Sequence, residues 1–215
     1  MAAPLPLMVD LDGRCCLVVG GGEVATRKVL TLLDAGARVT VASPHLAAPL
    51  AELHEAGRID WRPGPYAGLR PAPPEGPWML VVAATDDPER NERVAADAEA
   101  AGTWANVATR PDGGGAAFAA TWRSGPITAA VSTSGIHPGA GRWLRDRLAA
   151  AIGPEPATAL ELVAELRDEE VAAGGPGRRP DWRAAVDSGM LDHIRAGQLA
   201  EAKERLEACL SSSSD

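Results

Sequence analysis

The feature that most constrains the fold is a short apolar run that leads directly into three glycines. Residues 15–19 read Cys-Cys-Leu-Val-Val without polar alternation, which is typical of a parallel strand buried on both faces. Gly20, Gly21 and Gly22 follow at once, and the apolar residues after them recur at helical spacing. This order predicts a strand, a tight turn and a helix.

The spacing of the small residues matches a turn that binds dinucleotides. Gly20, Gly22 and Ala25 read as G-x-G-x-x-A. In that pattern the first residue permits a tight turn, the second lets the backbone approach a pyrophosphate, and the third lets the helix lie close to the strand. An ordinary Gly-rich turn is the alternative, but the flanking strand and helix favour a nucleotide site, with phosphates at the helix amino terminus.

Strands alternate with helices up to about residue 110. Further apolar strands are expected at residues 38–42, 59–62, 78–84 and 104–107. Ser43 and Pro44 predict the start of a helix that runs to about Glu55, and Asp86 or Asp87 predicts the cap of another. The alternation predicts an α/β fold with a parallel, Rossmann-like sheet over residues 1–112.

The pattern changes after residue 112. Two strands at residues 117–122 and 127–132 have no helix between them, so they predict a hairpin, and a helix with Trp143 follows. Two strands and one helix are too few to bury a core alone, so we expect residues 113–153 to pair with a second copy in a homodimer. Residues 154–215 are expected to form a small all-helical domain.

Composition excludes several classes of partner. The net charge of −8 argues against nucleic acid and anionic membrane surfaces as partners, although residues 106–150 carry a local charge of +3 that suits an anionic small molecule. No apolar stretch approaches the ~18 residues of a membrane span. The amino terminus lacks a signal-peptide pattern, and the three cysteines give neither a disulfide framework nor a metal-ligand spacing. We therefore expect a cytoplasmic protein without a bound metal.

Several motifs occur together in a specific order. They are Leu5-Pro6 and the segments 19–28, 35–41, 83–91, 106–107, 125–127 and 130–135. In this order they resemble the precorrin-2 dehydrogenase / sirohydrochlorin ferrochelatase family, the amino-terminal module of siroheme synthases. The resemblance covers residues 5–150 closely and the helical tail more loosely. It implies a homodimer that oxidises precorrin-2 to sirohydrochlorin with NAD, and in some members inserts iron.

The resemblance also implies cofactor contacts. Together with the glycine motif, they are Gly20, Gly22, Glu23, Val24, Ala25, Pro44, His45, Ala84, Thr85 and Asp86. Rossmann domains ordinarily place an acidic residue near the end of the second strand to hold the ribose hydroxyls, but residues 41–45 contain no acid. The choice of NAD therefore rests on the resemblance alone.

One departure from the family concerns catalysis. The family reads Asn-Val-x-Asp after the fifth strand, whereas this chain has Thr109 at the aspartate position. A neutral hydroxyl cannot accept a proton as a carboxylate does. Asp112 is a candidate replacement, with a simple turn residue as the alternative. His137 is either a proton acceptor or iron ligand, or a loop residue.

The remaining candidates are polar residues for the substrate. Serine and threonine hydroxyls could bind substrate carboxylates or cap a helix, and arginines could pair with carboxylates or remain solvated. These candidates are Asn106, Arg110, Ser132, Thr133, Ser134 and Arg142. Two other functions stay open: a dinucleotide-binding regulator or redox sensor without catalysis, and a chelatase that inserts a metal on the same fold.

Overall fold

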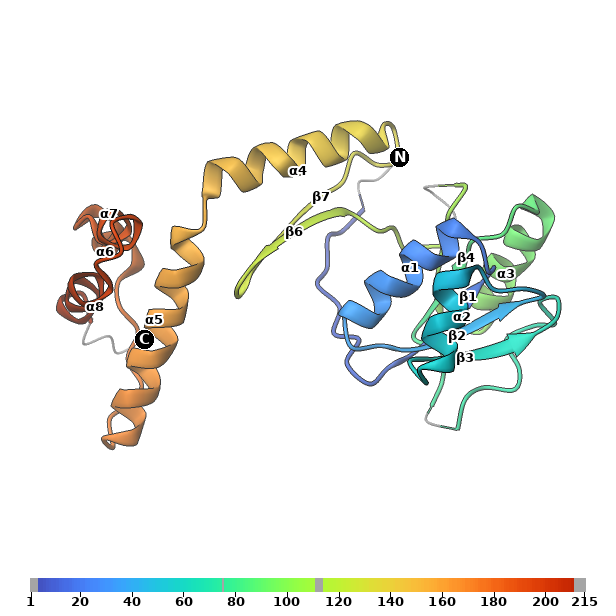
Figure 1. The fold of residues 1–215 in the computed structure, drawn as a ribbon, viewed down its shortest axis with the longest axis horizontal. Helices are drawn as coiled ribbons and strands as arrows, with labels where there is room; N and C mark the ends of the chain where they lie inside the picture. Colours follow the sequence, from blue (N-terminus) through green and yellow to red (C-terminus); the bar gives the residue numbers. More distant parts are fainter. Residues whose placement is uncertain (1–3, 75, 111–113, 211–215) are drawn as a thin grey trace. The chain divides into compact units, whose positions relative to one another are not determined.

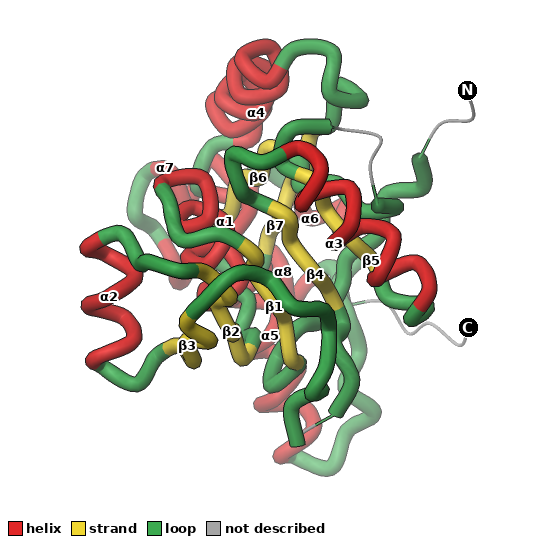
Figure 2. The backbone as a smooth tube through the Cα atoms, turned by 90° about the vertical axis from the view of Figure 1, so that its right-hand side faces the viewer, coloured by secondary structure: helices red, strands yellow, loops and turns green. Residues whose placement is uncertain are grey.

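Five parallel strands form the centre of the first part of the chain. In this computed structural model, which describes residues 4–74, 76–110 and 114–210, they pair in the order β3-β2-β1-β4-β5 (Figure 2). The strands are β1 (Cys15–Val19), β2 (Arg38–Ser43), β3 (Ile59–Pro63), β4 (Leu80–Ala83) and β5 (Trp104–Val107). All four neighbouring pairs are parallel, which confirms the predicted Rossmann-like sheet.

Helices cover both faces of this sheet. The helices α1 (Glu23–Asp34) and α2 (Ala48–Glu55) pack on the face that carries Cys16 and Val18. The helix α3 (Pro88–Ala100) packs on the opposite face, which carries Cys15 and Leu17. Because successive strand residues point to opposite faces, the two neighbouring cysteines lie in separate halves of the core.

The starts of two helices were predicted with different success. Asp87 caps α3 as expected, since its Oδ1 accepts a hydrogen bond of 3.1 Å from the Arg90 backbone N–H. The helix start at Ser43 was wrong, because Ser43 is still in β2 and its hydroxyl donates to the His45 carbonyl (2.8 Å). The Ala47 N–H donates to the Gly21 carbonyl (2.8 Å), and α2 begins one residue later. Residues 44–47 are thereby held against the glycine turn.

The second part of the chain contains the predicted hairpin and helices. Strands β6 (Ala120–Ser124) and β7 (Ile127–Val131) are antiparallel, and α4 (Pro138–Ile152) packs along them (Figure 1). The other helices are α5 (Glu155–Ala172), α6 (Trp182–Asp187), α7 (Met190–Arg195) and α8 (Leu199–Ala208). They bury a small core of their own around Leu162, Met190 and Leu206.

Contacts divide the chain into two units. The first consists of Met1–Phe118 with Ser134–Ile136, and the second of Ala119–Thr133 with His137–Asp215. The separation of a dimerisation module (113–153) from a helical domain (154–215) stays a prediction. Within the described ranges, no helix combines the length and the apolar character needed to cross a membrane.

Candidate functional site

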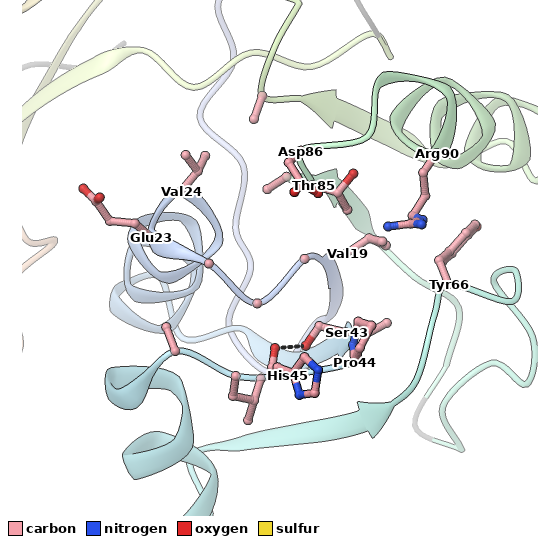
Figure 3. Close-up of a pocket in the computed structure, with 18 of the residues that line it drawn as sticks. Val19, Glu23, Val24, Ser43, Pro44, His45, Tyr66, Thr85, Asp86 and Arg90 are labelled. Atoms are coloured by element: carbon pink, nitrogen blue, oxygen red, sulfur yellow. Dashed lines mark hydrogen bonds between the residues drawn. The ribbon is translucent and has the colours of Figure 1, made fainter.

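A cleft of about 780 Å³ opens at the carboxyl ends of β1, β2 and β4, within the first unit (Figure 3). Open parallel sheets bind their ligands at this edge. The cleft walls come from four segments: the glycine turn and the start of α1, the residues after β2, the loop after β3, and the turn between β4 and α3. Ala108 and Thr109, which follow β5, complete the lining.

Two of the three glycines are required by close backbone contacts. Gly20 has φ +123°, and a Cβ there would lie 2.3 Å from the Ala84 carbonyl oxygen. A Cβ at Gly21 would lie 1.9 Å from the His45 carbonyl oxygen. Both distances are far below van der Waals contact, so the glycine turn packs directly on the turns after β4 and β2. The sequence motif treats Gly21 as a free position, which it is not.

Gly22 has a different environment. It lines the cleft, its φ is −91°, and a Cβ added there would meet nothing within 4 Å. It is also the N-cap of α1, and no side chain of the described residues caps this helix end. The amino terminus of α1 therefore faces open space with its first N–H groups available, which suits a pyrophosphate. The residues present fit a dinucleotide at this point.

The turn after β4 is fixed by a buried amide. Thr85 donates to Asn91 Oδ1 through its backbone N–H (3.1 Å) and its hydroxyl (2.8 Å), and Asn91 Nδ2 donates back to the Thr85 carbonyl (3.0 Å). The Asn91 side chain is 1% exposed. These bonds hold Ala84, Thr85 and Asp86 in the cleft wall, where the sequence predicted them.

Tyr66 and Arg90 line the cleft and were not predicted. The Tyr66 hydroxyl donates to Asp97 Oδ2 on α3 (3.0 Å), and burial together with this hydrogen bond raises the pKa of Tyr66. Arg90 forms an ion pair with Asp87 (3.1 Å). Tyr66 follows β3 in a loop whose path the sequence does not reveal, so no spacing rule could place it. The position of Arg90 near the cleft could have been suspected from the sequence, because it lies three residues after Asp87, one of the two predicted caps.

The predicted cofactor residues lie in the cleft with one exception. Ala25 is fully buried between α1 and the sheet, where it gives the close packing expected of the third small residue. The other nine predicted positions line the cleft. Among the described lining residues, Glu23 and Asp86 carry the carboxylates, and the end of β2 has none.

Asn106 organises the segment after β5. Its Nδ2 donates to the Ala116 carbonyl (2.9 Å), and backbone bonds join Ala105 to Gly114 and Ala116. Asn106 is 5% exposed, and its Oδ1 has no partner among the residues that the structure describes. Thr109 lies in the cleft and Arg110 pairs with Glu92 at 3.5 Å, whereas Asp112 falls outside the described residues.

The other predicted residues divide between the two units. Ser134, with φ +50°, belongs to the first unit, whereas Ser132, Thr133, His137 and Arg142 belong to the second. His137 is the N-cap of α4, and its Nδ1 accepts from the Ala140 N–H (3.0 Å). Within the described ranges, no three His, Cys, Asp or Glu residues group together in a way that could hold a metal.

Comparison with known proteins defines the family. The model of a family described as "Putative NAD(P)-binding" matches residues 7–120, which is more than half of the chain. The chain belongs to this NAD(P)-binding family. The match supports a nicotinamide dinucleotide as the cofactor, as the glycine motif predicted, and the residues that bind it stay a prediction.

Similar proteins extend the comparison beyond that domain. Siroheme synthase of Chromobacterium violaceum is 38% identical over 205 residues, covering 94% of this chain and 43% of the relative. Siroheme synthase 1 of Aeromonas salmonicida is 38% identical over 208 residues, covering 92% and 43%. The chain thus spans less than half the length of these relatives. These matches confirm the resemblance seen in the motifs.

A solved structure supports the fold. The structure of SirC, precorrin-2 dehydrogenase, has a TM-score of 0.67 to this chain at 23% identity and covers 95% of this chain and 98% of its own. At that identity the likeness confirms the fold, from the parallel sheet to the helical tail.

Proposed function

We propose that this chain is an NAD-dependent dehydrogenase that oxidises precorrin-2 to sirohydrochlorin in siroheme synthesis. The observation that carries the proposal is the 38% identity to siroheme synthases over 205 residues, which includes residues of both units. The cleft supports it, because its open helix terminus suits the cofactor of a dehydrogenase.

The reaction removes a hydride and a proton from the tetrapyrrole. Bound NAD supplies the hydride acceptor. The chain's own contribution to cofactor binding is the α1 terminus at Gly22 for the pyrophosphate and the Thr85 turn for the nicotinamide side. We assign NAD rather than NADP on the family resemblance, and residues 43–47 contain no Lys or Arg to pair with a 2′-phosphate.

The proton needs an acceptor on the protein or in water. We assign this role to Asp112, because Thr109 has no carboxylate where the family has one. His137 is a second proton acceptor in this proposal; because its Nδ1 accepts from the Ala140 N–H, the neutral ring carries its hydrogen on Nε2, so a proton is taken up at Nδ1 and replaces the α4 cap bond. The substrate carboxylates are assigned to Arg110 and Arg142. Hydroxyl and amide contacts to the substrate are assigned to Asn106, Ser132, Thr133 and Ser134.

We also propose a homodimer formed through the hairpin and α4. Trp143, Leu144 and Leu148 on α4 are 61%, 39% and 43% exposed in the single chain. Large apolar side chains at this exposure on one helix are typical of a surface that a partner covers. A second copy of this chain is the partner in this proposal.

The proposal is tested by turnover. Purified protein is incubated with precorrin-2 and NAD⁺, and the absorbance of sirohydrochlorin and NADH is followed. We expect both products. Binding of NAD⁺ without either product would favour the regulator or redox sensor, for which Thr109 is the supporting observation. Cobalt or iron uptake by supplied sirohydrochlorin, without oxidation of precorrin-2, would favour the chelatase.

A further inference from the structure

One end of the cleft is built from flat and apolar groups. Pro44, Pro65 and Tyr66 line it together with Arg90. Figure 3 shows Tyr66 and Arg90 at the opposite side of the cleft from Glu23 and Val24, which mark the start of α1. This end contains no carboxylate among the described lining residues, so it does not suit a cation or a sugar held through its hydroxyls.

The rest of the cleft restricts what this end can bind. The pyrophosphate of a dinucleotide belongs at the α1 terminus, and the nicotinamide belongs on the side of the β4 turn and Thr109, where the reaction takes place. The adenosine half must then extend past the end of β2 towards Tyr66 and Arg90. We propose that these two residues form the adenine site, with the Arg90 guanidinium stacked on the purine ring.

The Arg90 side chain has the position and chemistry for stacking. It extends from the first turn of α3 into the cleft and ends between Val19 and Tyr66 (Figure 3). Its ion pair with Asp87 joins two side chains that are 36% and 39% exposed, and such a pair contributes little stability. A planar guanidinium is weakly hydrated and stacks well on aromatic rings.

Tyr66 supplies a rigid wall for the same site. It is 7% exposed, and its hydrogen bond to Asp97 ties the loop after β3 to α3, the helix that carries Arg90. The two residues therefore come from segments that are fixed to each other. A preorganised pair of walls lowers the entropy that a flat ligand loses on binding.

The inference rests on the proposed function, since it needs an adenine dinucleotide as ligand. Its test is calorimetric titration of the full chain with NAD⁺, NADP⁺ and ADP-ribose, which contains the adenine half without the nicotinamide. Arg90→Gln is expected to weaken NAD⁺ and ADP-ribose alike by about 3- to 10-fold. Arg90→Lys keeps the charge but loses the plane, so it should weaken both nearly as much.

Arg93→Gln is the matched control. Arg93 is an exposed cation on the same helix whose charge acts on Tyr66 but whose side chain does not line the cleft, so its removal should lower both affinities much less than Arg90→Gln does. Unaltered NAD⁺ affinity in Arg90→Gln would overturn the adenine-site inference and leave the proposed function standing. So would a loss confined to NAD⁺, which would place Arg90 at the nicotinamide, or a loss confined to NADP⁺, which would make it a 2′-phosphate ligand. If the unaltered chain binds neither NAD⁺ nor ADP-ribose, the proposed function fails as well.

Discussion

Thr85 and Asn91 hold each other through three hydrogen bonds, two donated by Thr85 and one donated by the Asn91 amide. The first residue lines the cleft, and the second is buried in α3. Because the Ala84 carbonyl also limits the space at Gly20, this pair sets the position of the cleft wall against the glycine turn. The wall of the cleft thus depends on an amide that does not itself line the cleft.

Asn91→Ala should weaken both the fold and the site. It removes the amide that pairs with the part-buried N–H and carbonyl of Thr85, which costs about 1–3 kcal/mol in the free energy of unfolding. NAD⁺ affinity should fall as the turn loosens. Urea unfolding and NAD⁺ titration measure the two effects. Full NAD⁺ affinity in a folded Asn91→Ala protein would contradict the positioning role.

Substitution by alanine should lower stability at Gly21 and NAD⁺ affinity at Gly22. Gly21→Ala forces the His45 carbonyl to move, so we expect a loss of about 1–3 kcal/mol in stability. The Gly22→Ala methyl group would meet no atom of the described residues within 4 Å, so stability should change by less than about 0.5 kcal/mol. This methyl group enters the space assigned to the pyrophosphate, and NAD⁺ affinity should fall at least tenfold. Thermal unfolding and NAD⁺ titration compare the two variants. Equal losses of stability in Gly21→Ala and Gly22→Ala would contradict this prediction.

Asp112→Ala tests the assigned base. Loss of general-base help reduces a rate by about 10²–10⁴-fold, so a fall in kcat of at least tenfold with little change in the KM for NAD⁺ is expected. Thr109→Asp in the same background restores a carboxylate at the family position and should recover part of the rate. Steady-state kinetics provide the measurement. Full activity of Asp112→Ala would reduce Asp112 to a turn residue.

Glu155 should make the helical unit sensitive to acid. A hydrogen bond from its own backbone N–H and one from Arg195 (2.7 Å) lower the pKa of Glu155 below its ordinary value of 4.5. The ionised form therefore stabilises the folded state at neutral pH, and this contribution is lost as the pH falls below 4.5 and through the lowered pKa. Glu155→Gln should be less stable at neutral pH and lose less on acidification.

The measurement for Glu155 is urea unfolding followed by circular dichroism at neutral pH and at about pH 3. Asp168→Asn, an exposed carboxylate on the same helix, is the control and should keep the pH dependence of the unaltered chain. An unchanged pH dependence in Glu155→Gln would show that the Arg195 pair does not contribute.

Trp143→Asp should disrupt the proposed homodimer. An exposed charge costs little on a free surface, but a buried unpaired carboxylate at an interface is strongly unfavourable. Sedimentation velocity should show dimers for the unaltered chain and monomers for the variant, with circular dichroism unchanged. If Trp143→Asp forms dimers as stable as those of the unaltered chain, then α4 is not part of the dimer interface.

Local patterns were enough to predict much of the fold. The apolar run of β1, the glycine turn and the Asp87 cap each depend on neighbouring residues, so the sheet and the start of α3 were predicted correctly. The helix start at Ser43 was wrong because the Gly21 carbonyl, distant in sequence, takes the Ala47 N–H, and residues 44–47 are non-helical. Ser43 and Pro44 have the composition of a cap, but tertiary contacts decide their conformation.

The candidate site was predictable only in part for the same reason. Residues adjacent to the glycine motif or matched to family motifs were found in the cleft. Tyr66 reaches it through the irregular loop after β3, and the constraint on Gly21 comes from the backbone of His45. Neither relationship has a fixed spacing along the chain, so periodicity and motif analysis cannot detect it.

The most direct test of the account is the ratio of NADH to sirohydrochlorin formed from precorrin-2 and NAD⁺, recorded for the unaltered chain and for Gly22→Ala. We expect equimolar formation of the two products by the unaltered chain and a strongly reduced rate for the variant at low NAD⁺. Sirohydrochlorin formed without NADH, or neither product formed by a folded protein that binds NAD⁺, would contradict it.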